Sequence, residues 1–400
     1  MSLLDFRNAF ITRLNSRLAA INCATASDND LLLAGAMFKQ LDAVNKIDPI
    51  TIDALRIIEN MSAAELDAYA LDPSSRMHVQ NIIKDSAAMP ALVQSTAAIN
   101  AIAGSAEWIK LIAADAGGLS VVVGSTTAMN AIAANATARN TIGTGTGTFI
   151  TAIKSSNMAI AKLLAGYAGV TPADYADMTV LAASNAAMNA VAANATARNL
   201  IGNAGTAFDQ VKVSPVAMAK MLAALCALVP ANYADTTAFA ASTPAMTALA
   251  ASTDGLNFLA LSTTAIATLF NNNNARATLW ASDTAAGVLL NNTTSRTYLT
   301  SLCSQITFYP FSNTNQLAKK VWLLRVYAIY TSTAGNMSWS YCAAGSSFNS
   351  VTGNTTPYYK STNPFDIAAT QAKASALTLS STLSGAAPDG AQYFYLQMEA

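Results

Sequence analysis

The stretch AASTPAMTALAASTDGLNFLALSTTAIATLFNNNNARATLWASDTAAGVLLNNTTSRTYL, residues 240–299, carries a leucine at every tenth position. Seven residues before each leucine stands a serine or an asparagine. Such side chains accept hydrogen bonds from first-turn amides when they occupy a helix N-cap. Positions four and seven after the cap lie on one face of a two-turn helix. The spacing therefore predicts a row of short capped helices. The leucines are Leu249, Leu259, Leu269, Leu279, Leu289 and Leu299.

The same unit recurs upstream, with caps at Ser95, Ser125 and Ser214 among others. The run Thr171-Pro-Ala-Asp174 also predicts a helix start, with a Thr cap, Pro at the first helical position and an acid at the third. Isolated helices of this length are marginal in water. We therefore expect residues 86–302 to form an array, a shaft in which each unit is stabilised by its neighbours.

The ten-residue units are themselves grouped into a longer sequence repeat. TAMNAIAANATARNTIG at 127–143 and AAMNAVAANATARNLIG at 186–202 are near copies. The segment that begins at Met158 has a counterpart that begins near Ala219. About six ten-residue steps separate the copies, which indicates that the array grew by duplication.

Asn caps are followed four residues later by arginine instead of an apolar residue. One interpretation is that successive helices face different sides and that the arginines lie on a wetter face. The other is that they cap the carbonyl ends of a neighbouring helix or chain. These candidate contacts are Arg139, Arg198, Arg276 and Arg296.

The two ends of the chain differ from the array. Residues 1–85 hold nineteen of the 44 charged side chains and predict a helical head, with a capping box at Ser62 and Glu65. The head is either an attachment region or a cap that closes the array. Residues 303–400 predict an antiparallel β domain, a sandwich or a small barrel, from strand patterns such as VWLLRVYAIY at 321–330.

Aromatic residues near small polar ones suit sugar binding, because ring faces stack on sugars and hydroxyls take hydrogen bonds. In a β domain such rings are also common core residues. The candidate receptor or glycan contacts are Trp339, Tyr341, Tyr358 and Tyr359.

Composition argues against several functions. The formal net charge is zero and charged residues make up 11%, so we expect no nucleic-acid partner. No run of about 20 apolar residues predicts a membrane span, and the charged N-terminus does not resemble a signal peptide. The four cysteines form no CxxC pair, and free thiols in a reducing cytoplasm are expected.

An enzyme is not predicted. His78 is the chain's one histidine, so a catalytic triad would depend on it alone, and no zinc-ligand cluster is present in the sequence. The glycine-rich run GTGTGTF at 143–149 lacks the GK[ST] ending of a phosphate loop. We expect no catalytic, cofactor-binding or metal-binding residues.

A helical head, an Ala/Ser/Thr/Asn-rich array with AMNAIAANATARN copies and an aromatic β C-terminus resemble the virion proteins of tailed bacteriophages, of the fibre, collar or tail-appendage kind. The resemblance implies assembly in the host cytoplasm, a homo-oligomer (most often a trimer), docking to other virion proteins by the N-terminal head, and an outward C-terminal domain that contacts host glycan or protein. The array departs from the β-rich shafts common in such fibres. A collar or decoration protein and a bacterial surface adhesin are the alternatives.

Overall fold

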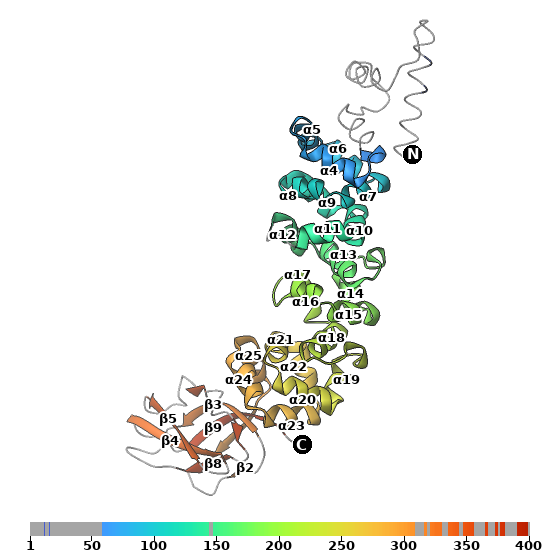
Figure 1. The fold of residues 1–400 in the computed structure, drawn as a ribbon. Coiled ribbons are helices and arrows are strands. Elements are labelled where there is room, and N and C mark those ends of the chain that lie inside the picture. Colours follow the sequence, from blue (N-terminus) through green and yellow to red (C-terminus); the bar gives the residue numbers. More distant parts are fainter. Residues whose placement is uncertain are drawn as a thin grey trace. The chain divides into compact units, whose positions relative to one another are not determined.

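The structure is a computed structural model of the chain. It describes residues 12, 16, 58–143, 147–308, 316–317, 321–329, 335–343, 347–355, 365–366, 373–374, 377–380 and 390–398. Between residues 58 and 301 the described chain is mainly helical, and its helices are short and packed together (Figure 1). It divides into two units, Met1–Leu181 with Asn194–Ala207, and Ala182–Ala193 with Phe208–Ala400.

Apart from a helical segment that ends at residue 60, the first unit contains α4 to α13, a 3₁₀ turn and α16. Their bounds are α4 Ala63–Leu71, α5 Pro73–Lys84, α6 Ala88–Leu92, α7 Thr96–Gly104, α8 Ala106–Ala113, α9 Ala116–Gly124, α10 Thr126–Ala134, α11 Ala136–Gly143, α12 Thr148–Ser155, α13 Asn157–Ala168, η1 Pro172–Asp174 and α16 Ala195–Ile201. Two further helices, α14 (Met178–Ala183) and α17 (Thr206–Val211), lie where the chain passes between the units.

The second unit contains the remaining helices and the described strands. The helices are α15 Asn185–Ala193, α18 Pro215–Leu225, η2 Pro230–Asn232, α19 Thr236–Ala241, α20 Thr243–Ala251, α21 Thr253–Leu259, α22 Thr263–Phe270, α23 Asn273–Ala281, α24 Asp283–Asn291 and α25 Thr293–Ser301.

Within each unit a helix packs against the next one in sequence and against the third one along. In the first unit α7 contacts α10, α10 contacts α13, and α8 contacts α11. In the second unit α18 contacts α21, α21 contacts α24, and α19 contacts α22. Three short helices therefore make one coil, and α10 begins thirty residues after α7. The helices α4 and α5 pack on α7 and α8 in the same way.

The predicted caps are confirmed. The hydroxyls of Ser95, Ser125 and Ser214 each accept a hydrogen bond from the amide three residues on, at 3.2 Å in every case. The capping box is also present, because the Ser62 and Glu65 side chains each accept from the other's backbone amide. Each cap supplies an acceptor to a first turn that has no intrahelical partner for its amides.

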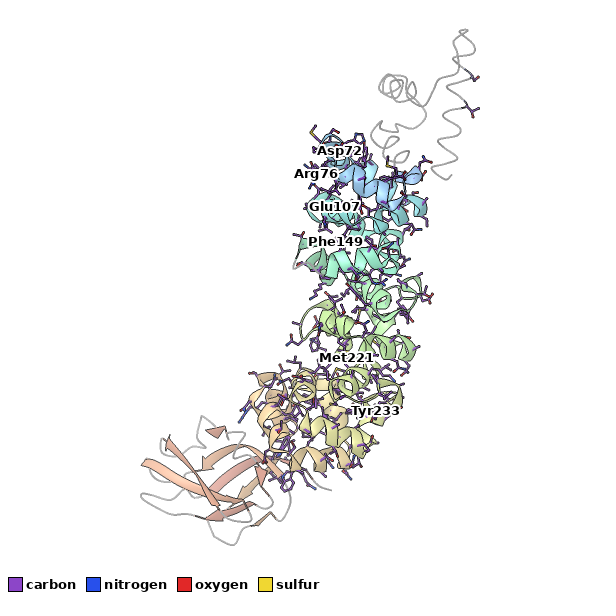
Figure 2. All side chains as sticks on the ribbon, viewed as in Figure 1. Asp72, Arg76, Glu107, Phe149, Met221 and Tyr233 are labelled. Atoms are coloured by element: carbon purple, nitrogen blue, oxygen red, sulfur yellow. The ribbon has the colours of Figure 1, made fainter. Side chains whose placement is uncertain are left out.

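The leucines at every tenth position lie in the core. One of these leucines lies in each of α20 to α25, and all six are fully buried. Met221 and Tyr233, labelled in Figure 2, are buried in the same unit. The residues 240–299 thus form successive short helices and not one long rod, as the periodicity predicts.

Cap serines also join successive coils. The Ser282 hydroxyl accepts from the Ala285 amide and donates to the carbonyl oxygen of Ala250 at 2.6 Å. Ser214 donates in the same way to Ala182, at 2.7 Å, and in the first unit Ser125 donates to Val93, at 3.3 Å. In each case the acceptor lies 32 residues earlier, so one hydroxyl satisfies two helix ends in adjacent coils.

Small side chains allow the coils to approach closely. A Cβ atom at Gly166 of α13 would lie 2.0 Å from the Ala133 carbonyl oxygen of α10. The two backbones are therefore in direct contact at this point, which only glycine permits. Fully buried alanines such as Ala98 and Ala128 serve the same close packing in α7 and α10.

One predicted helix start is only partly confirmed. Pro172–Asp174 forms only a 3₁₀ turn, and the Thr171 side chain makes no cap hydrogen bond. The buried ammonium of Lys162 donates hydrogen bonds to the carbonyl oxygens of Pro172 and Ala173, at 2.9 and 3.5 Å. A continuing α-helix would use those carbonyls as its own acceptors. Here the turn ends at Tyr175, which is extended, and Lys162 supplies their hydrogen bonds instead.

The described residues after Cys303 include strands, and every pairing among these strands is antiparallel. One sheet has the order β1-β9-β3-β6 with β7 also on β3, and the other has the order β2-β8-β4-β5. The bounds are β1 Ser304–Phe308, β2 Gln316–Leu317, β3 Val321–Ile329, β4 Gly335–Ala343, β5 Ser347–Thr355, β6 Phe365–Asp366, β7 Lys373–Ala374, β8 Leu377–Ser380 and β9 Gly390–Gln397.

Within the described residues no single helix is both long and apolar enough to cross a membrane. Only α9 and α10 taken together reach that length and apolarity, and they meet at a bend of 89°.

Candidate functional site

The described residues bring no three His, Cys, Asp or Glu side chains together in a way that could hold a metal ion. His78, half-buried on α5, packs edge-on against the Tyr69 ring, with the ring centres 6.4 Å apart. Burial raises the pKa of the Cys226 thiol to about 11, and a hydrogen bond with Ser252 offsets part of that shift. A thiol with so high a pKa is a poor nucleophile at neutral pH.

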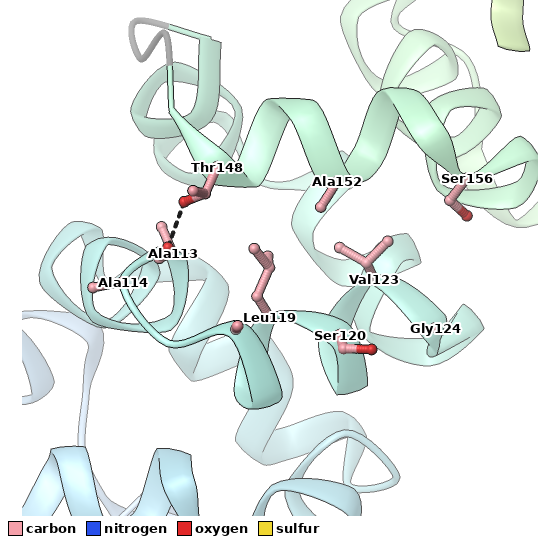
Figure 3. A pocket seen from close by; sticks show the side chains of 10 residues that line it. Ala113, Ala114, Leu119, Ser120, Val123, Gly124, Thr148, Ala152 and Ser156 are labelled. Atoms are coloured by element: carbon pink, nitrogen blue, oxygen red, sulfur yellow. Dashed lines mark hydrogen bonds between the residues drawn. The ribbon is translucent and has the colours of Figure 1, made fainter.

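A hollow of about 520 Å³ lies between α8, α9 and α12 in the first unit (Figure 3). Leu119 and Val123 of α9 form its apolar floor, and Ala152 of α12 faces them. The remaining lining residues are Ala113, Ala114, Ala116, Ser120, Gly124, Thr148 and Ser156.

Two of the hydroxyls that line this hollow are already hydrogen-bonded to backbone groups of the helices. Thr148 Oγ1 donates to the carbonyl oxygen of Ala113 at 2.5 Å, and Ser156 Oγ accepts from the Ala159 amide at the start of α13. No titratable side chain is among the lining residues. The hollow can therefore receive a small apolar group, but its lining has no general acid or base that could activate the hydroxyls of Ser120, Thr148 or Ser156.

Three of the four arginines that follow Asn caps bond the helix before them. An NH1 atom donates to the carbonyl oxygen six residues earlier: Arg139 to Ala133 at 2.6 Å, Arg276 to Phe270 at 3.0 Å and Arg296 to Leu290 at 3.1 Å. Each guanidinium thus caps a carbonyl end within its own chain. All four arginines, Arg198 included, are half-buried.

Arg139 also belongs to a link between coils. Its guanidinium carbon lies 5.8 Å from the centre of the Tyr167 ring, and the Tyr167 hydroxyl donates to the Arg139 carbonyl oxygen at 2.6 Å. The Tyr167 carbonyl in turn accepts from the Asn194 side chain, which caps α16. Burial raises the pKa of the Tyr167 phenol, and the nearby Arg139 charge partly opposes this. The phenol is therefore a neutral hydrogen-bond donor at physiological pH.

Two buried lysines hold equivalent turns, one in each unit. Lys162 and Lys220 are each 1% exposed, and Lys220 donates to the Pro230 carbonyl oxygen at 3.2 Å. Burial lowers the pKa of both lysines, and the charges of Asp174 and Asp235 partly offset the shift. The sequence analysis did not single these lysines out. Their spacing of 58 residues, the offset of the long repeat, was the signal that could have found them.

The candidate aromatic contacts are only partly placed. Trp339 and Tyr341 lie in β4, opposite Val351 and Asn349 of β5. Tyr358 and Tyr359 lie outside the described residues. Because the structure describes only two of these four aromatics, it does not test whether they form one site.

Comparison with known proteins adds no family assignment, because no family model matches this chain and no curated protein is significantly similar to it.

Proposed function

We propose that the chain is a structural component of a bacteriophage virion, a fibre, spike or collar appendage. The observation that supports this is the bonding between coils by cap side chains, as in the contact from Ser282 to Ala250. Such contacts give an array of individually weak helices the stiffness that a spacer between two attachment points requires. The proposed site of action is the virion, after assembly in the host cytoplasm.

The proposed C-terminal part, residues 303–400, is an antiparallel β domain that presents contacts to the host surface. Trp339 and Tyr341, two residues apart on β4, and the pair Tyr358 and Tyr359 are the proposed glycan or protein contacts. Rings near small polar residues such as Ser340 and Asn354 suit carbohydrate without any catalytic group. We propose no cofactor and no enzymatic activity.

The proposed N-terminal head, residues 1–85, docks to other virion proteins, and the chain forms a homo-oligomer with a trimer favoured. Only 11% of the residues are charged. A low-charge shaft is suited to sheltering part of its surface against sister chains. The molar mass of the purified full chain in solution, measured by light scattering, tests this directly. A stable monomer at micromolar concentration would remove the oligomer from the proposal.

Mass spectrometry of purified particles from the phage that encodes the chain tests the virion role. We expect the chain in intact particles, in a fixed ratio to the other structural proteins. Absence from particles, with abundant protein in the infected-cell lysate, would contradict it.

Binding of the full chain to host cells separates an appendage that contacts a receptor from a collar or decoration protein. The full chain is the better probe than residues 303–400 alone, because Val321 and Trp322 are fully buried in the second unit. We expect Tyr358→Ala with Tyr359→Ala to weaken cell binding and to leave incorporation into particles intact. Incorporation without any cell binding of the unaltered chain favours the collar role.

A further inference from the structure

The last coil of the helical array has no following coil to cover it. The core at this end includes Leu279 of α23 and Leu299 of α25, from the last coil, and Phe270 of α22, from the coil before it, which are 0%, 0% and 4% exposed. In a stack of repeats the terminal unit needs a cap, because its outer face would otherwise expose apolar surface. Some other part of the chain must therefore cover these residues.

The start of β3 covers part of this coil. Val321 and Trp322 are both fully buried, and the Trp322 ring centre lies 5.7 Å from that of Phe270. The indole N–H of Trp280, on α23, donates to the Val321 carbonyl oxygen at 3.2 Å. Packing and a directed hydrogen bond thus join β3 to two different helices.

The end of β9 lies beside it. Val321 pairs with Gln397 and Trp322 pairs with Leu396 in the antiparallel register. Leu396 is 6% exposed and Met398 is fully buried, and β9 contacts α25. The two strand ends therefore bring their apolar residues to the last coil as one pair.

We infer that the paired ends of β3 and β9 are the C-terminal cap of the helical array and fold with it as one unit. The chain then joins the strands to the array at three places, namely the connection after α25, the start of β3 and the end of β9. A single connection at residues 302–304 would allow a hinge, whereas three joined points with buried aromatic packing hold a fixed orientation. This inference does not depend on the proposed function.

Hydrogen exchange of the full chain, followed by mass spectrometry, tests the cap. In Trp322→Ala the amides of α22 to α25 should exchange roughly tenfold faster or more, because large-to-small core substitutions destabilise and local opening follows local stability. The matched control is Phe348→Ala in β5, the outer strand of the four-stranded sheet. This control should leave exchange in α22 to α25 within twofold of the unaltered chain, roughly the spread expected for independent sites.

Unchanged exchange of α22 to α25 in Trp322→Ala, with faster exchange in the strands alone, would overturn the inference. If Trp322→Ala does not accumulate as folded protein, Trp280→Phe decides the question. That substitution removes the donor to Val321 and keeps a ring on α23, so we expect a smaller acceleration in the same helices. Exchange at the original rate in Trp280→Phe would then reject the cap.

Discussion

Ala227 adopts the left-handed backbone conformation that Gly169 adopts at the equivalent point of the long repeat, with φ of 56° and 72°. The two residues follow α18 and α13, and each helix end is closed in the same way. The Leu228 amide donates to the Ala223 carbonyl at 2.8 Å, and the Val170 amide to Ala165 at 3.0 Å. This 6→1 bond is the mark of a Schellman motif, which favours glycine.

Replacing Ala227 by glycine should therefore stabilise the protein. The alanine Cβ makes a left-handed conformation unfavourable by about 1 kcal/mol, and glycine removes that penalty. We expect Ala227→Gly to raise the free energy of unfolding by about this amount, partly offset by glycine's greater entropy in the unfolded chain. Urea denaturation followed by circular dichroism measures the change.

The reverse substitution is the matched control. No atom lies within 4 Å of a Cβ built on Gly169, so Gly169→Ala tests the conformation without a steric clash. We expect a loss of about 1 kcal/mol. If both substitutions shift stability in the same direction, the left-handed conformation is not what governs these two helix ends.

A second prediction separates the two roles of a cap serine. Ser282→Ala removes both the acceptor for the Ala285 amide and the donor to Ala250. Ser242→Ala removes the acceptor for the Ala245 amide, and that cap bond is the contact the structure shows for the Ser242 hydroxyl. Losing a cap costs about 1 kcal/mol and losing a hydrogen bond about 1 kcal/mol more.

We therefore expect Ser282→Ala to lower the free energy of unfolding by roughly twice as much as Ser242→Ala. The two serines are both half-buried N-caps in the second unit, so the comparison isolates the bond between coils. Equal losses would show that the contact from Ser282 to Ala250 adds no stability.

Features that depend only on residues close together in the sequence could be predicted. A cap at Ser252 and apolar residues at Leu256 and Leu259 indicate where α21 begins and which face it buries. The arginine contacts are local too, because each acceptor lies six residues before the arginine. That is why one of the two interpretations of Arg139 already included the carbonyl end of a neighbouring helix.

The coil of three helices could not be predicted in the same way. Ten-residue units describe each helix, but which helix lies beside which depends on contacts about thirty residues apart, such as Ser125 with Val93. The long repeat held part of this information, because it spans about six ten-residue units, and six helices make two coils of three. The packing of Trp322 on Phe270 joins a strand to a helix 52 residues earlier, and no local pattern encodes it.

A third prediction concerns how the free energy of unfolding changes with pH in alkaline solution. Burial lowers the pKa of Lys162 below its ordinary value of 10.5, so the unfolded chain keeps this proton to a higher pH than the native chain. The stability contributed at this site therefore rises as the pH increases from the lowered native pKa to 10.5. Lys162→Met has no titrating group there, so the unaltered chain should gain stability relative to this variant across the same window.

Urea denaturation at several pH values above about 8 measures this difference. Lys154→Met is the control, because Lys154 is exposed on α12 and its replacement removes the same charge from the chain. Lys154→Met gives the reference for the loss of one exposed positive charge. A pH dependence for Lys162→Met no larger than that of the Lys154→Met reference would show that burial does not perturb Lys162.

The last prediction is a coupling between Gly143 and Tyr167. A Cβ on Gly143 would lie 2.2 Å from the Tyr167 hydroxyl oxygen and 3.4 Å from the ring carbon that carries it. Gly143→Ala should therefore cost about 1–3 kcal/mol through overpacking. Tyr167→Phe should cost about 1 kcal/mol, because the hydrogen bond to Arg139 is lost.

In the double variant the hydroxyl that clashes is absent, and the new methyl group meets the ring carbon at an ordinary contact distance. We expect the double variant to lose less stability than the sum of the single variants, by about 1 kcal/mol or more in a double-mutant cycle. Gly143→Ala combined with Ser242→Ala, a position in the other unit, should instead be additive within about 0.5 kcal/mol. Additivity in the Gly143 and Tyr167 cycle would mean that α11 and α13 do not meet at the hydroxyl of Tyr167.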